Sequence, residues 1–172
     1  MLTTLEPFLI RLFHLIDEAG VDVSKFEMDH VCYRVATMER YHELCHAWSR
    51  YTKNHEFHES LVNGRPIAVF VLASPPTICG RVIPVVELPA PKDGVVYEDG
   101  WEHAEFVLDE PFQHFMSRYE ELPFDRKSLG KELNPELGLK LGLGLQVKFH
   151  HQSLAEIIKI EAERGLNLMH PV

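Results

Sequence analysis

The stretch Asp29-His-Val-Cys-Tyr-Arg-Val35 alternates apolar and polar side chains, as a strand with one buried face does. The same alternation returns in Trp101-Glu-His-Ala-Glu-Phe-Val-Leu108, again with a histidine on the polar face. Each stretch is followed by helix-start residues, Thr37 in one case and Asp109 in the other. The helical stripes that follow have the same spacing: Tyr41, Leu44, Cys45 and Trp48, then Phe112, Phe115, Met116 and Tyr119. This repetition predicts two copies of one strand–helix unit.

Each unit is expected to continue into three more strands. We place them at residues 58–62, 66–72 and 82–88 in the first unit, and at 126–130, 137–141 and 145–150 in the second. Asn63-Gly64 is a strong hairpin signal, and Pro84 predicts a late start or a bulge because it lacks an N–H donor. The predicted fold is α+β: two βαβββ modules, roughly residues 28–88 and 101–151, that form one cup-shaped mixed sheet.

Helices are expected at both ends of the chain. Thr3 and Glu6 have the spacing of a capping box before an apolar helical stripe, and Gly20 ends that helix. Ser153 and Glu156 repeat the capping-box spacing before a last helix. The module helices, at 38–52 and 111–121, should lie outside the cup. Because no linker rich in Pro, Ser or Gly divides residues 1–172, we expect a single domain.

Composition excludes several classes of function. The 172 residues are 45% hydrophobic, which is enough for one well-buried core. The net charge of -9 and the absence of a Lys/Arg run argue against a nucleic-acid surface. Three scattered cysteines without a C-x-x-C pair indicate reduced thiols and a cytoplasmic location. Glu6, Pro7 and Arg11 interrupt the N-terminal apolar stretch, so we expect no signal peptide, and no stretch is apolar enough to span a membrane.

Four polar residues on the predicted concave face suggest a metal site. If the first and last strands of each module are neighbours, His30 comes near Glu87 and His103 comes near His150. Each of these residues alternates with apolar neighbours that should face the helices. Imidazole and carboxylate ligands together suit a divalent ion such as zinc, manganese, iron or nickel. A single strand histidine is more often structural, and the prediction rests on the four occurring in matching places.

Three further residues on the same faces are candidates for substrate chemistry. Arg34 and Lys148 could bind a carboxylate or another anion, Arg34 with two parallel hydrogen bonds and Lys148 as a point charge. Glu105, two residues beyond His103, could act as a general base or orient a metal ligand. A salt-bridge network inside the cup is the alternative explanation for all three.

One motif points to different chemistry. His42-Glu-Leu-Cys-His46 matches H-E-x-x-H, in which two histidines one helical turn apart bind zinc and Glu43 serves as base. The pattern is short enough to arise by chance. Leu44 and Cys45 belong to the apolar stripe, which turns His42 and His46 towards the flanks of the helix. A zinc protease-like site at His42–His46 is therefore a remote alternative.

Several stretches together resemble the YecM family over nearly the whole chain. They are Asp29-His30 with Arg34, Asn63-Gly-Arg-Pro-Ile67, Val86-Glu-Leu-Pro89, Gly100-Trp-Glu-His103 with Glu105, Leu133-Asn-Pro135, and Lys148-Phe-His150 with Ser153. The resemblance implies a fold of the vicinal oxygen chelate type, similar to glyoxalase I, bleomycin-resistance proteins and extradiol dioxygenases. Those proteins place metal ligands on the strands that carry His30, Glu87, His103 and His150 here. Most have a carboxylate at the last position, so glyoxalase activity is not carried over.

Three functions remain open from the sequence. The first is a metal-dependent enzyme, an isomerase, lyase or dioxygenase, in which the metal holds a small oxygenated anion. The second is a protein that binds or sequesters a small molecule without catalysis. The third is an interaction module without a metal. We expect a small-molecule ligand, no nucleic acid and no membrane partner, and related folds often pair as homodimers.

Overall fold

An open, mixed β-sheet forms the centre of the structure, which is a computed structural model describing residues 2–62, 64–96, 98–165 and 167–171. Its eight strands run in the order β10-β2-β3-β6-β1-β7-β9-β8. The strands are β1 (Glu27–Arg34), β2 (Glu56–Val62), β3 (Arg65–Val71), β6 (Val85–Pro89), β7 (Gly100–Val107), β8 (Glu136–Gly142), β9 (Leu145–His150) and β10 (Asn167–Pro171). The helices are α1 (Leu5–Glu18), α2 (Met38–Ser49), α3 (Phe112–Ser117) and α4 (Leu154–Glu163), with short 3-10 turns at Leu2–Thr4 and Lys53–His55.

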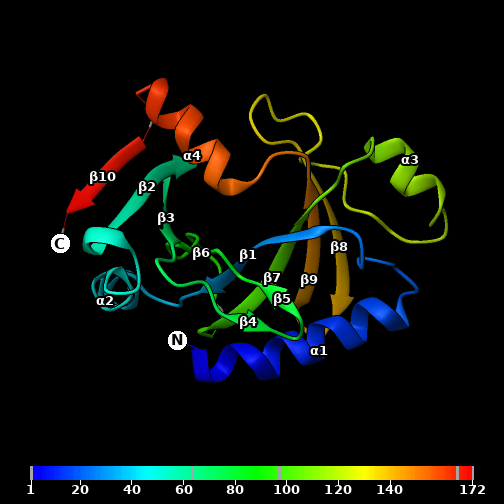
Figure 1. Cartoon of the computed structure of the whole chain (residues 1–172), viewed down its shortest axis with the longest axis horizontal. Helices are drawn as coiled ribbons and strands as arrows, with labels where there is room; N and C mark the ends of the chain where they lie inside the picture. Colours follow the sequence, from blue (N-terminus) through cyan, green and yellow to red (C-terminus); the bar gives the residue numbers. More distant parts are fainter. Residues whose placement is uncertain (1, 63, 97, 166, 172) are drawn as a thin grey trace.

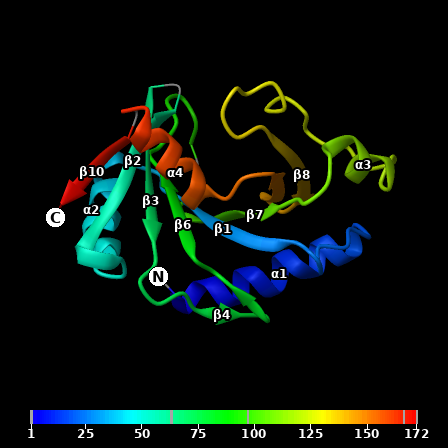
Figure 2. The same ribbon diagram turned by 45° about the horizontal axis from the view of Figure 1, so that its top comes forward.

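The first module has the predicted βαβββ order. β1 is followed by α2 and then by β2, β3 and β6, which lie side by side with β1 in Figure 2. The first and last strands, β1 and β6, are parallel neighbours. Thr37 caps α2 by accepting a hydrogen bond from the Arg40 backbone N–H, as predicted. β6 starts after Pro84, which confirms the late start, while Asn63 of the predicted turn lies outside the described residues.

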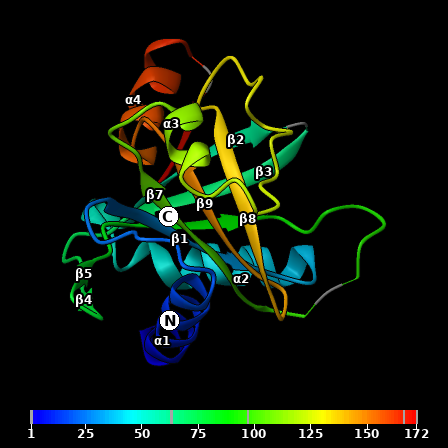
Figure 3. The same ribbon diagram turned by 90° about the vertical axis from the view of Figure 1, so that its right-hand side faces the viewer.

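The second module follows the same plan with one strand missing. β7 and β9 are parallel neighbours, and β8 pairs with β9 on the outer side (Figure 3). The strand predicted at 126–130 is wrong: next to the sheet this region has an isolated bridge between Asp125 and Gly138 and a hydrogen bond from the Glu136 N–H to the Ser128 carbonyl, and it forms no strand. Turn-forming residues such as Ser128 and Gly130 occupy the stretch instead, and Asn134, four residues beyond it, has a φ of 50°. The helix predicted at 111–121 is also shorter, because α3 ends at Ser117.

The two modules join through an antiparallel pair of strands. β1 and β7 lie next to each other, with Cα pairs His30–Glu105 and Cys32–His103. When one module is superimposed on the other, His30 therefore occupies the position of His103, and Cys32 occupies the position of Glu105. The sheet is continuous across this junction, so side chains from both modules lie next to each other on the same face of the sheet.

Helices cover the two faces of the sheet unequally. Phe13 of α1 contacts Phe106 on β7, and Trp48 of α2 contacts Phe70 on β3, so α1 and α2 share the face that carries the main core. α4 packs on the opposite face, where Ile158 meets Val69 and Val85. Figure 1 shows the sheet between α1 and α4. None of the described helices has the length and apolar character needed to cross a bilayer.

Some local features differ from the sequence-based expectation. The N-cap of α1 is Thr4, with no side-chain cap hydrogen bond, so the capping box at Thr3 is wrong. The Ser153 capping box of α4 is present in full. Two elements had no prediction: β10, and a small hairpin of β4 (Thr77–Ile78) and β5 (Arg81–Val82). The hairpin is held by Arg81, which donates to the carbonyls of Phe26 and Val23.

Candidate metal centre

The candidate centre lies on neighbouring strands near the middle of the sheet. β1, β6, β7 and β9 present apolar side chains such as Val31, Val86 and Ala104 to the main core. Side chains in a strand alternate between faces, so His30, Glu87 and His103 point to the opposite face. The sequence folds this way because one face of each strand must be apolar to pack against α1 and α2.

Four side chains bring ligand atoms together on this face. His30, Glu87, His103 and Glu105 each offer a nitrogen or oxygen within 4.8 Å of the others. Nε2 of His30 lies 3.2 Å from Oε2 of Glu87 and 3.4 Å from Oε1 of Glu105. Nε2 of His103 lies 3.0 Å from the same Glu105 oxygen. Both histidines and Glu105 are buried, so water does not compete freely for these atoms.

Three of the four ring nitrogens of His30 and His103 lack a hydrogen-bond partner among the described residues. Nε2 of His30 and both nitrogens of His103 are buried, and no group in the described part of the chain is aligned to bond them. They are close to carboxylate oxygens without N–H···O geometry. Ligands bound to one ion at roughly 2.0–2.2 Å stand about 3 Å or slightly more from each other. The separations of 3.0–3.4 Å fit donors that point at a shared ion rather than at one another.

The charges around the group also fit a divalent cation. Glu102 is balanced by Arg34 at 2.7 Å, and Glu136 by Lys131 at 2.9 Å. Three buried or half-buried carboxylates remain, those of Asp29, Glu87 and Glu105. The fixed cation beside them is Lys148, whose Nζ lies 3.0 Å from Glu105. Three negative charges against one positive charge leave a surplus of two.

In the metal-free protein, a proton on His30 can offset part of this surplus negative charge. Burial disfavours the charged imidazole, but the Glu105 charge and the Asp29 hydrogen bond outweigh it and raise the pKa of His30 well above its ordinary value. Burial likewise opposes ionisation of Glu87, yet the nearby His30 lowers the pKa of Glu87 to about 2. For Glu105, Lys148 and His30 outweigh burial and hold the pKa well below its usual range. The carboxylates are therefore ionised at neutral pH.

His150 belongs to a neighbouring group. Its Nε2 lies 3.3 Å from Asp29 and 4.0 Å from Glu105, and its ring is 5.8 Å from that of His30. Asp29, His30 and His150 form a second set with the spacing of metal ligands. The strand register explains why His150 lies outside the first group. Glu87 pairs with Cys32, and the equivalent pair in the second module is Lys148 with Glu105. Lys148, not His150, is thus the structural counterpart of Glu87.

Arg34 and Lys148, the predicted anion-binding residues, already have protein partners. Arg34 donates to Glu102, while Lys148 contacts Glu105 and Glu136 at 3.0 and 3.4 Å. The structure therefore contains the salt-bridge network that was the alternative explanation. Both residues also line a cavity of about 450 Å³ next to the candidate centre. Glu87 and His103 of the candidate centre line this cavity, and so do Arg65 and Lys92.

Comparison with known protein families gives a match over most of the chain. The profile of the YecM protein family matches residues 1–143. The chain belongs to the YecM family. Protein YecM of Escherichia coli (strain K12) is 33% identical over 110 residues, covering 58% of this chain and 54% of that protein. An uncharacterised protein of Haemophilus influenzae is 30% identical over 101 residues, covering 57% and 50%. The chain spans about half the length of these curated relatives.

A solved structure supports the fold of this YecM-family chain. The structure described as Structural Genomics, Protein EC4020 has a TM-score of 0.71 and 27% sequence identity, and the match covers 90% of each chain. The family match includes His30, Glu87, His103 and Glu105. It ends at residue 143, so the predicted residues Lys148 and His150 lie beyond it. Their place near the centre comes from the pairing of β9 with β7.

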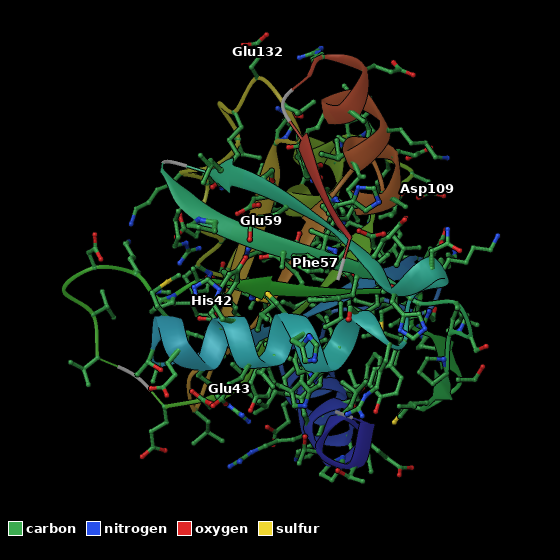
Figure 4. All side chains as sticks on the ribbon, turned by 90° about the vertical axis from the view of Figure 1, so that its left-hand side faces the viewer. His42, Glu43, Phe57, Glu59, Asp109 and Glu132 are labelled. Atoms are coloured by element: carbon green, nitrogen blue, oxygen red, sulfur yellow. The ribbon has the colours of Figure 1, made fainter. Side chains whose placement is uncertain are left out.

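The H-E-x-x-H motif of this YecM-family chain lies away from the candidate centre. His42, Glu43 and His46 are exposed on α2, which covers the other face of the sheet (Figure 4). Glu43 forms an ion pair with Arg40 at 2.8 Å. Among the described residues, the sets with metal-ligand spacing do not include this motif. The arrangement gives no support to the remote zinc protease-like alternative.

Asp29 is the main residue that the sequence analysis missed. Its carboxylate accepts a hydrogen bond from Nδ1 of His30 at 2.7 Å and from the Leu154 backbone N–H at 2.8 Å. Burial opposes its ionisation, but contacts with His150 and His30 hold the pKa of Asp29 well below its usual range. The signal was its position directly before His30. In an ideal strand adjacent side chains face opposite ways, and a register irregularity between Met28 and His30 breaks that rule.

Proposed function

We propose that this protein is a metal-dependent enzyme of the vicinal oxygen chelate type that acts on a small oxygenated anion. His30, Glu87 and His103 would hold a divalent ion, with Glu105 as the fourth ligand. One observation carries the proposal: the buried histidine nitrogens face carboxylates at 3.0–3.4 Å without hydrogen-bond geometry. The two-negative surplus of the surrounding carboxylates supports the same assignment.

Nitrogen and oxygen ligands in this mixture suit zinc, manganese, iron or nickel. A bound ion of this kind would act as a Lewis acid towards two oxygens of the substrate. Asp29 would fix the orientation of His30, because its hydrogen bond to Nδ1 leaves Nε2 directed at the centre. His150, the fourth ligand expected from the sequence, would be an additional donor beside Asp29.

Glu105 fits a ligand better than the general base proposed from the sequence. Its Oε1 lies within 3.4 Å of nitrogens from His30, His103 and Lys148. An oxygen surrounded by three nitrogens leaves little room for a substrate proton. The lowered pKa of Glu105 also makes it a weak base. Lys148 would then position the Glu105 carboxylate and limit the surplus negative charge.

The proposal is tested by metal binding to protein without a histidine tag. Wild-type protein should bind one divalent ion, measured by elemental analysis and titration calorimetry. His103→Ala should abolish binding, because it removes a nitrogen that has no other partner. Glu87→Gln should weaken binding while preserving shape, since the amide keeps the size of the carboxylate but loses its charge.

His151→Ala is the matched control. His151 is exposed, its ring lies tilted against that of Phe112 at 4.1 Å between centroids, and it is absent from the described metal-binding sets. It should bind the ion as wild type does. If wild-type protein binds no divalent ion, the enzyme proposal fails and the cluster is an ion-pair network. If the ion binds but no small molecule is converted, the sequestering function replaces it.

A further inference from the structure

Arg65 is a cation in the cavity that has no partner among the residues described by the structure. It lies at the start of β3 and lines the cavity of about 450 Å³ together with Glu87 and His103. Its side chain is half-buried and makes no hydrogen bond or ion pair with any residue that the structure describes. A half-buried guanidinium has lost part of its hydration, so an anion that reaches it gains charge-assisted hydrogen bonds.

The other charged groups inside the cavity are already engaged. Arg34 is paired with Glu102, and Lys148 with Glu105. Glu87 points to His30 in the candidate metal centre. Arg65 therefore offers positive charge that the described protein groups do not neutralise.

Strand geometry places Arg65 away from the centre. Val69 pairs with Glu87, and Arg65 lies four residues earlier on the same strand and the same face. Four residues of strand span roughly 13 Å between Cα atoms. The side chains of Arg65 and Glu87 both line the cavity. An offset of this length along the strand suits a molecule whose two polar ends are separated by a few carbon atoms.

We infer that the substrate is a small dicarboxylate-type molecule that chelates the metal with one end and binds Arg65 with a carboxylate at the other end. The inference rests on the proposed function and adds the substrate class to it. A guanidinium binds a carboxylate through two parallel hydrogen bonds, which also fixes the direction in which the molecule lies. A cavity of about 450 Å³ is within the usual range for small-molecule sites.

A graded set of 2-hydroxy acids tests this inference on the metal-loaded, full-length protein. Lactate has the chelating end alone, whereas tartronate, malate and 2-hydroxyglutarate add a carboxylate at increasing distance. 3-Phosphoglycerate keeps the chelating end and replaces the distal carboxylate by a phosphate. Dissociation constants are measured by calorimetry. At least one dicarboxylate should bind more tightly than lactate by about 10- to 100-fold, the usual worth of a charge-assisted contact.

Variants of Arg65 identify the source of that gain. Arg65→Ala should remove the advantage of the dicarboxylate and leave lactate and metal binding unchanged. Arg65→Lys should restore part of it, because the charge remains and the paired geometry is lost. Arg50→Ala is the control, since Arg50 is exposed on the far side of the sheet beside α2. It should match wild type in every titration.

The outcomes separate this inference from the proposed function. If the wild-type protein binds no divalent ion, the proposed function itself is rejected. Normal metal binding with equal affinity for lactate and all dicarboxylates would reject only the substrate class. An advantage that survives in Arg65→Ala would reject the role of Arg65. A gain seen with 3-phosphoglycerate and with none of the dicarboxylates would overturn the carboxylate assignment.

Discussion

Asp29, the residue directly before His30, contacts several groups of the candidate centre. Asp29 accepts from Nδ1 of His30 and from the Leu154 N–H, and it lies 3.3 Å from Nε2 of His150. One carboxylate therefore connects β1, β9 and the start of α4. Its hydrogen bond selects the His30 tautomer whose Nε2 is free to bind an ion.

Asp29→Asn should weaken metal binding by about 10- to 100-fold, as is typical when the residue that orients a ligand is changed. The amide can still accept from Nδ1 of His30, but it lacks the charge that strengthens this hydrogen bond, so it holds the ring and its tautomer less firmly. Calorimetric titration with zinc measures the effect, and circular dichroism checks the fold. Asp22→Asn, an exposed site near α1, serves as the control. Equal affinity in Asp29→Asn and wild type would show that Asp29 does not position His30.

For single residues, the sequence predicts which side chains lie on the polar face of a strand, but it does not predict which of them lie opposite each other. His30, Glu87 and His103 could be selected because each interrupts an apolar alternation, and the structure brings them together. His150 satisfied the same alternation, as did Lys148 two residues earlier. Which of the two lies opposite Glu105 depends on strand register. Alternation has a period of two residues, so it cannot distinguish such a shift.

Individual elements decide which histidines can share an ion. In α2, Tyr41, Leu44 and Trp48 are buried against the sheet, and this orientation leaves His42 and His46 exposed. Glu43 is engaged by Arg40. The helix therefore presents the H-E-x-x-H residues to solvent on the face opposite the candidate centre.

His46→Ala should leave the metal content unchanged. The side chain is exposed and lies on the other side of the sheet from His30 and His103, so it shares no ligand atoms with them. Elemental analysis of the purified variant beside wild type and His103→Ala gives the comparison. Loss of one equivalent of metal in His46→Ala, with retention in His103→Ala, would move the site to α2.

The elements that were predicted well have a strong local cause. β1 and β7 have clear alternation, and the caps at Thr37 and Ser153 use side-chain hydrogen bonds that act over three residues. The strand expected at 126–130 failed because turn-forming residues surround it and only one bridge forms, at Asp125. β10 depends on pairing with the distant β2, for which a local pattern carries no information.

The whole molecule places the candidate centre at the junction of its modules. His30 and Glu87 come from the first module, and His103 and Glu105 come from the second. Because β1 and β7 are paired strands, an ion held by all four would connect the two halves of the sheet. The repeat that was visible in the sequence is therefore also the reason for a shared site. We propose that both modules unfold together as one domain.

A metal that binds the folded state should stabilise the whole chain, and the gain should increase with pH. At a free metal concentration near one hundred times the dissociation constant the gain is about 2.7 kcal/mol, or roughly 5–10 °C in melting temperature for a chain of this size. The raised pKa of His30 sets the pH dependence. In the metal-free protein its contribution to stability is complete below about pH 6.5 and is lost as pH rises through the raised folded-state value.

The ion and the proton compete for the same nitrogen of His30. Low pH therefore favours the protonated, metal-free cluster, and higher pH favours the ion. Thermal melts with and without zinc between pH 6 and pH 8, on the order of the range where histidine titrates, should show a widening difference. His103→Ala should show no difference at any pH. A difference that stays constant or narrows as pH rises would contradict competition at His30, and two separate transitions would contradict a centre shared by both modules.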